Sequence, residues 1–303
     1  MKNLITPIEQ EWEIWKDCLH GNDKNALWYQ VIDLIRDEGL YRLILESRQL
    51  TIDRNPVKPP INNHLHNFID RVYSQSLFIS VRRIIGSEKT DTLKGPKGVY
   101  SFNSLIKDIE KYQSDLTREK YFILRGIPYE IEEMQKKEDS YVRTQVAKNI
   151  NGFFIPHEYS VTPTLDAHQI YDKVSCKCEK NRSRFDLISD QYIQAIRNEL
   201  EKAQKIIDFT DKNVAHSATP ESRATVNLNP LSLKETWDVC IILVEILNLF
   251  GSFLSGTIFM VLPFEPRDFF DYWDSPLVPK GYETELKKVY RDFRIETGQW
   301  NTD

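Results

Sequence analysis

The segment Thr210–His216 combines the residue types best suited to acid–base chemistry on an anionic substrate. It reads Thr-Asp-Lys-Asn-Val-Ala-His, so a carboxylate, an amine, an amide and an imidazole follow one another closely. On a helix, Lys212, Asn213 and His216 would share one face, because side chains three and four positions apart lie over one another. An imidazole titrates near neutral pH and can act as general acid or base. The alternative for His216 is structural, since a histidine near a helix end can stabilise the last carbonyls.

We expect residues 182–216 to form one long amphipathic helix that presents this segment at its end. No proline or glycine interrupts the stretch, and Pro220 provides a stop beyond it. Apolar residues recur in the steps of three, four or seven that keep one stripe on a helix. They are Phe185, Ile188, Tyr192, Ile196, Leu200, Ala203, Ile207 and Val214.

Arg82 and Arg83 lie near the end of a second predicted helix, residues 63–86, which Asn62 or Asn63 would cap. The helix dipole favours a cation at this end, so the two arginines are either structural charges or contacts for a phosphate. Apolar periodicity, capping patterns and breaks predict further helices. They cover residues 7–20, 23–50 and 101–112, pieces of 117–150 broken near Gly126–Pro128, residues 232–262 and a short piece at 282–295.

These elements predict an all-α fold, a single domain over residues 1–303 that forms a bundle of long amphipathic helices. A short irregular or extended insertion is expected at about 151–181, where Pro156 and Pro163 bound strand-like residues. A C-terminal aromatic tail is expected from about residue 263. The apolar stretch Val239–Leu262 is long enough to span a membrane. Glu245 near its centre and the lack of basic anchors favour a buried core helix, and a membrane span stays the alternative.

The bulk composition narrows the partners. A net charge of −5 provides no overall field that attracts a polyanion, which argues against DNA as a partner. RNA stays a potential partner, and it would have to bind at a local basic patch. The four cysteines are too few and too scattered for a disulfide framework, and no signal peptide is predicted, so we expect a cytoplasmic protein. No cofactor or metal is expected. His64 and His66 are not expected to bind one metal ion together, because His64 lies about 200° around the helix from His66. Cys176-x-Cys178 is not expected to bind zinc, because the chain has no second cysteine pair at zinc-ligand spacing.

The segment Asp211–His216, followed by a loop and a largely apolar final helix, resembles the HEPN superfamily, in particular the abortive-infection AbiU-type HEPN-like proteins of bacteria. Phe68–Gly86 and the later Ser101-Phe102-Asn103-Ser104-Leu105 are similar to the family's stretch in which a helix ending in a basic residue precedes a Ser-x-x-Ser-Leu helix start. The likeness covers roughly residues 24–116 and 182–262, and its motifs are short.

The resemblance implies an all-α protein of phage defence or of a toxin–antitoxin type system, frequently a homodimer, with an antitoxin or another protein as a potential partner. Ribonucleases of this family cleave RNA without metal, through an arginine and a histidine separated by four to six residues. The histidine acts as acid and base on the 2′-hydroxyl, and the arginine stabilises the charge of the phosphorane.

This chain departs from the family pattern at the arginine. The permitted spacings before His216 reach Asp211, Thr210 and Phe209, and none of them is arginine. A cation would have to come from Lys212, from Arg223 in the following loop, or from Arg82 or Arg83. Two hypotheses follow. In the first, the chain is a ribonuclease with catalytic residues His216, Lys212 and Asp211 and substrate-binding residues Asn213, Arg82, Arg83 and Arg223. In the second, it is a non-catalytic HEPN-like binding or regulatory protein whose segment caps a helix or forms a dimer face.

Overall fold

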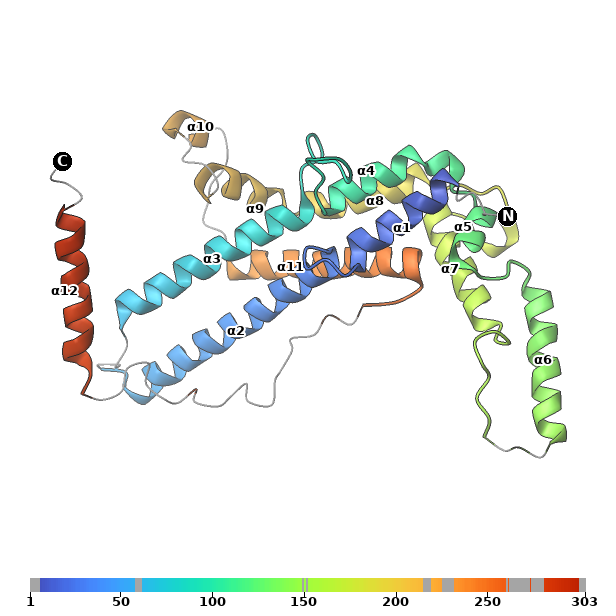
Figure 1. Ribbon diagram of the computed structural model, residues 1–303, viewed down its shortest axis with the longest axis horizontal. Helices are drawn as coiled ribbons and strands as arrows, with labels where there is room; N and C mark the ends of the chain where they lie inside the picture. Colours follow the sequence, from blue (N-terminus) through green and yellow to red (C-terminus); the bar gives the residue numbers. More distant parts are fainter. Residues whose placement is uncertain are drawn as a thin grey trace. The chain divides into compact units, whose positions relative to one another are not determined.

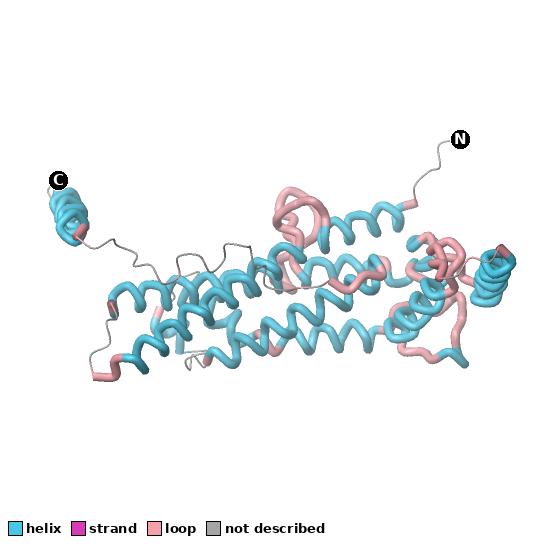
Figure 2. The backbone as a smooth tube through the Cα atoms, turned by 90° about the horizontal axis from the view of Figure 1, so that it is seen from below, coloured by secondary structure: helices cyan, strands magenta, loops and turns pink. Residues whose placement is uncertain are grey.

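The structure is a computed structural model that describes residues 6–57, 62–148, 150, 152–214, 219–224, 232–259, 261, 273 and 281–299. It divides into two compact units, Met1–Pro263 and Phe264–Asp303, and the boundary lies where the aromatic tail was expected to begin. The described residues form helices and loops, with one isolated β-bridge between Thr92 and Gly98 (Figure 2). The predicted all-α bundle is therefore confirmed. The described helix of the second unit is α12 (Glu283–Gln299).

The core of the first unit lies between its long helices. Helices α1 (Pro7–His20), α2 (Leu27–Arg54), α3 (Asn63–Ile85) and α11 (Leu233–Ser255) run side by side in the bundle (Figure 1). Trp12 of α1 is 1% exposed and meets the ring of Phe253 from α11 edge-on, with ring centroids 5.6 Å apart. The apolar positions at helical spacing in the sequence thus face one another across a shared core.

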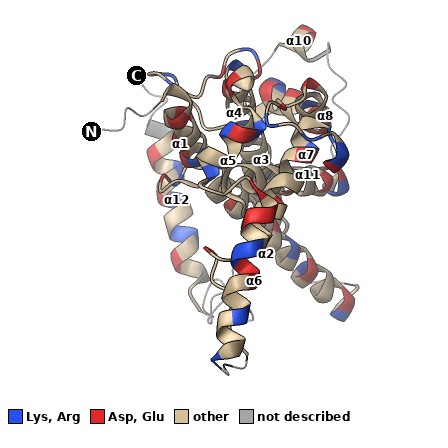
Figure 3. Ribbon diagram, turned by 90° about the vertical axis from the view of Figure 1, so that its right-hand side faces the viewer, with Lys and Arg blue, Asp and Glu red and all other residues tan. Residues whose placement is uncertain are grey.

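Capping residues explain why several helices begin where the sequence predicts. Asn62 accepts a hydrogen bond from the backbone N–H of Leu65 and starts α3. Ser101 and Ser104 form a capping box on α4 (Phe102–Lys111), and Ser232 with Glu235 does the same on α11. The predicted break at Gly126 is also confirmed. It separates α5 (Arg118–Arg125) from α6 (Ile131–Ala147), a charged helix directed away from the bundle that carries both signs (Figures 1 and 3).

Helix α11 buries one face and exposes the other. Leu243 and Leu247 are fully buried, whereas Ile241 is 57% exposed. The prediction of a core helix is confirmed for the buried face. This face packs against α1, α2, α7 (Thr162–Ser175) and α8 (Asp190–Glu201). Residues 234–255 also pass a test of length and mean hydropathy (1.8) for a membrane span, and half of the most apolar window is buried in the fold. Core helices of soluble proteins pass the same test.

The prediction of one uninterrupted helix over residues 182–216 is wrong. The structure has α8 (Asp190–Glu201), α9 (Gln204–Phe209) and a π-helix, η3 (Thr210–Val214). Before α8 the backbone forms hydrogen bonds with another helix. The carbonyls of Arg184 and Asp186 accept hydrogen bonds from the first backbone amides of α5. Ser189 then caps α8. Phe185 is consequently 78% exposed and does not belong to the apolar stripe.

The extended insertion predicted at 151–181 is also wrong for most of its length. It contains helix α7 (Thr162–Ser175) and the short 3₁₀-helix η2 (Glu179–Asn181). Pro163 stands in the first turn of α7, where a proline favours a helix start, and does not end a strand. Tyr171 is fully buried, and α7 packs against α8 and α11. This region therefore belongs to the core. The remaining short helices of the first unit are η1 (Gln113–Asp115) and α10 (Pro220–Ala224).

Candidate functional site

The π-helix η3 is anchored on the C-terminal half of α3. Thr210 is 1% exposed, and its hydroxyl donates to the carbonyl of Ile206 at 2.6 Å. The ring of Phe209, just before η3, packs edge-on against Phe78 of α3 at a centroid distance of 5.3 Å. A π-turn widens the helix by one residue, and such turns frequently occur at functional sites. The first residues of η3 are thereby brought to the basic end of α3.

Arg82 and Asp211 meet at this junction. Arg82 Nε lies 3.0 Å from Asp211 Oδ1, and the two side chains are 29% and 40% exposed. The Nη1 and Nη2 atoms of Arg82 have no hydrogen-bond partner among the described residues. Asp211 occupies one of the positions at which the family pattern has an arginine. The guanidinium of Arg82 therefore lies beside Asp211, the position at which this segment has no arginine. Its terminal nitrogens are available to an anion.

A hollow of about 270 Å³ beside this pair contains both arginines of α3. Arg83 is exposed, and its Nε donates to Gln30 Oε1 at 2.8 Å. Asp91 also lines the hollow, and Asp211 pairs with Arg82 beside it, so the two arginines face two carboxylates and the formal charges balance. The carboxylate of Asp91 accepts hydrogen bonds from the backbone N–H of Ser87 and from the Thr90 hydroxyl. The Nη edge of Arg82 and the side chain of Arg83 are the groups of the hollow that can contact a phosphodiester.

The other predicted site residues are placed differently. Lys212 Nζ donates to Ser222 Oγ of α10 at 2.7 Å, so the lysine holds the following turn. Asn213 is exposed, and its amide donates to the carbonyl of Phe209 at 3.2 Å. His216 and the side chain of Arg223 lie outside the described residues. Of the predicted set, the structure brings together Arg82, Arg83 and Asp211.

No protein-family model, curated protein or solved structure matches this chain. The resemblance to the HEPN superfamily therefore depends on its residues alone.

Sequence reasoning missed a row of polar residues on α8 and α9. Gln194, Arg197, Glu201 and Gln204 follow one another in steps of three or four and line a cleft with the end of α3 and with Asp211 of η3, which the sequence had identified. The signal was present, because the same spacing that marks an apolar stripe also marks a polar face on the other side of the helix. Only the apolar stripe entered the prediction.

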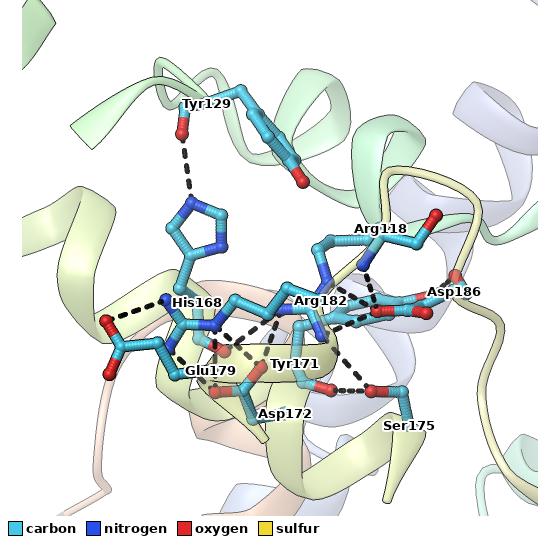
Figure 4. A network of polar contacts seen from close by, with 10 residues as sticks. Arg118, Tyr129, His168, Tyr171, Asp172, Ser175, Glu179, Arg182 and Asp186 are labelled. Atoms are coloured by element: carbon cyan, nitrogen blue, oxygen red, sulfur yellow. Dashed lines mark hydrogen bonds and ion pairs between the residues drawn. The ribbon is translucent and has the colours of Figure 1, made fainter. Parts of the chain in front are cut away.

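A buried ionic network around Arg118 was also missed (Figure 4). Arg118 is 0% exposed and contacts Asp172 at 2.9 Å and Asp186 at 3.0 Å. Arg182 adds a second ion pair to Asp172 at 2.7 Å. Burial disfavours ionisation of Asp172, but the hydrogen bonds and charges of Arg182 and Arg118 outweigh it and lower the pKa of this carboxyl. The network ties α5, α7 and the segment before α8 together, which is a structural role.

His168 of α7 lies beside this network. Its Nε2 atom is 2.9 Å from the carbonyl oxygen of Tyr129, and its Nδ1 atom is buried without a partner. Burial lowers the pKa of His168. The hydrogen bond to Tyr129 and the charge of Asp172 act in the opposite direction, and the charges of Arg182 and Arg118 reinforce the lowering. The folded protein therefore favours the neutral imidazole, which donates from Nε2.

The neutral His168 predicts a pH-dependent stability. A histidine whose pKa is lower in the folded than in the unfolded chain stabilises the fold above the unfolded value, about 6.5, and loses that contribution as the pH falls below it. We expect the Tm of the wild type to fall more steeply between pH 7.5 and 5.5 than that of His168→Gln, measured by differential scanning fluorimetry. His157→Gln, at an exposed histidine, serves as the control and should keep the wild-type slope. Equal slopes for wild type and His168→Gln would contradict the prediction.

Proposed function

We propose that this chain is a HEPN-like, metal-independent ribonuclease of a bacterial phage-defence or toxin–antitoxin type system, acting as a homodimer in the cytoplasm. The observation that supports the proposal is the ion pair between Arg82 of α3 and Asp211 of η3, at 3.0 Å. It provides a cation beside the segment Asp211–His216, which lacks the arginine of the family pattern.

In this proposal His216 removes the proton from a ribose 2′-hydroxyl, and the 2′-oxygen attacks the adjacent phosphorus. The bond from phosphorus to the 5′-oxygen breaks, and the leaving oxygen receives a proton from the imidazolium. The products are a 2′,3′-cyclic phosphate and a 5′-hydroxyl end. The free Nη atoms of Arg82 neutralise the charge that develops on the non-bridging oxygens.

In this proposal Asp211 and Lys212 position other groups of the site. Asp211 holds the Nε edge of Arg82 and so aims the other edge of the guanidinium outward, which makes it a positioning residue. Lys212 is engaged by Ser222 and positions α10 relative to η3. Arg83 lines the hollow with Arg82 and binds the phosphate as a second cation.

A non-catalytic HEPN-like binding or regulatory protein is the second candidate. One observation favours it, since the charge of Arg82 is already matched by that of Asp211. In this reading the ion pair fastens η3 to α3, and the surface recognises an antitoxin or another partner protein without cleaving RNA.

The two candidates predict different outcomes for His216→Ala. If the chain is a ribonuclease, induced expression of the wild type arrests bacterial growth, and the purified protein cleaves single-stranded RNA in EDTA. His216→Ala loses both effects and keeps the wild-type Tm, whereas the control His157→Ala keeps both. Growth arrest by wild type and His216→Ala alike, or by neither, would leave the catalytic role of His216 without support and favour the binding protein.

A further inference from the structure

A cleft of about 310 Å³ adjoins the arginine hollow and shares Arg82 and Gly86 with it. One wall is the end of α3 with the following loop and Asn103 of α4, and the other wall is the polar face of α8 and α9. Arg197 also lines the cleft, with its two Nη atoms paired to Glu88 at 2.8 Å and Glu110 at 2.7 Å. Arg82 lines both the cleft and the hollow, so the cleft adjoins the proposed phosphate site. Its volume is at the small end of the range for ligand pockets, roughly 300–1,000 Å³.

The walls of the cleft are apolar at the base and electrically balanced at the rim. Ile85, Leu200 and Ile207 line it and are at most 9% exposed. The charged lining residues are three cations and three carboxylates, so the formal charges cancel. They are Arg82, Lys89 and Arg197, and Glu88, Glu201 and Asp211. A neutral, flat group with polar edges suits such a cleft better than a second phosphate, because the lining of the cleft has no excess positive charge.

Two side-chain amides supply directional hydrogen bonds in the cleft. Gln204 Nε2 donates to Asp208 Oδ1 at 2.7 Å, and Asn103 Nδ2 donates to the carbonyl of Gly86 at 3.2 Å. Each contact orients an amide and leaves its oxygen and one N–H without a partner among the described residues. The oxygen and the remaining N–H of one such amide match the N6 donor and the N7 acceptor of adenine, because one Asn or Gln side chain can contact both.

We infer that this cleft binds one nucleobase, preferentially adenine, of a single-stranded RNA whose adjacent phosphate lies against Arg82 and Arg83. The inference rests on the proposed function and adds the substrate preference of the same site. Gln204 and Asn103 read the edge of the base, the apolar residues contact its face, and Arg82 separates the base cleft from the phosphate hollow.

The test is fluorescence anisotropy on the full chain carrying His216→Ala, which keeps the RNA intact. The probes are labelled hexa-adenylate and hexa-uridylate, with AMP as competitor. We expect hexa-adenylate to bind about tenfold or more tightly than hexa-uridylate, since one bidentate amide contact gives that degree of discrimination. Gln204→Leu and Asn103→Leu should bring the ratio close to one. Gln191→Leu, an exposed glutamine of α8 outside the cleft, should keep it. Arg82→Gln should weaken both probes alike.

Other outcomes identify which claim has failed. Equal binding of the two probes, or a ratio that Gln204→Leu and Asn103→Leu leave unchanged, overturns the base site while RNA cleavage by the wild type still supports the ribonuclease. If AMP displaces the probe and binds as tightly as hexa-adenylate, the ligand of the cleft is a free nucleotide and the assignment to RNA is overturned. Absence of RNA cleavage by the wild type and of binding by either probe removes the proposed function, and the inference with it.

Discussion

Arg118→Met is expected to lower the free energy of unfolding by about 3–5 kcal/mol, because it leaves the buried carboxylate of Asp186 without a cation. The Arg118 side chain is 0% exposed, and Asp186, its partner at 3.0 Å, is 7% exposed. Asp172 retains Arg182, but Asp186 keeps no second ion pair among the described residues. Urea unfolding followed by circular dichroism measures the loss. The free energy of unfolding of Arg118→Lys should lie between those of the wild type and Arg118→Met. An ammonium group keeps the charge but lacks the fork that contacts both carboxylates.

The matched control for Arg118→Met is Lys202→Met, at an exposed lysine paired with Glu199. This pair should contribute less than about 1 kcal/mol, because solvent screens it. Adding Asp186→Asn to Arg118→Met should restore part of the stability by removing the unpaired charge. If Arg118→Met costs no more than Lys202→Met, the network is not what joins α5, α7 and the segment before α8.

Local signals in the sequence were sufficient for much of the fold. Asn62, Ser101 and Ser232 each satisfy free amides of a first helical turn, and the helices they open begin where predicted. Gly126 adopts a left-handed conformation, with φ of 63°, and ends α5 as expected. Helix caps and helix-ending glycines depend on contacts between residues a few positions apart. They can therefore be predicted from the sequence alone.

The errors arose where distant residues decide the backbone. The segment before α8 has helical periodicity, yet the amides of α5 and the buried guanidinium of Arg118 hold it in a non-helical conformation. Pro163 was interpreted as a boundary, and only packing against α8 and α11 makes the following residues a core helix. Periodicity is a weak prior that tertiary contacts override.

The candidate site could be predicted only in part, for the same reason. The sequence identified Arg82, Arg83 and Asp211 separately, but the pair Arg82–Asp211 joins residues 129 positions apart, and no local pattern encodes that contact. The amides of Asn103 and Gln204 come from different helices and line one cleft only in the folded chain. Their chemistry is visible in the sequence, and their place in a common cleft is not.

Loss of Arg82 is expected to have a large effect on activity. Removing one group that stabilises the charge of a transition state typically slows a reaction by about 100-fold to 1,000-fold. Arg82→Asp should therefore reduce RNA cleavage by at least about 100-fold. Its ion pair is partly exposed and contributes little to stability, so the variant should remain folded. Arg36→Gln, at an exposed arginine of α2 that lines neither the hollow nor the cleft, serves as the matched control and should leave cleavage unchanged.

The charge exchange Arg82→Asp with Asp211→Arg is the most direct measurement of the central claim, that a cation from α3 completes the segment ending in His216. The exchange keeps the ion pair and moves the guanidinium into the position that the family pattern gives to its arginine. We predict that the single variant Arg82→Asp is inactive on labelled single-stranded RNA and that the double variant regains cleavage to within about tenfold of wild type. A folded Arg82→Asp protein that cleaves RNA at the wild-type rate, or a folded double variant as inactive as the single one, would contradict the account.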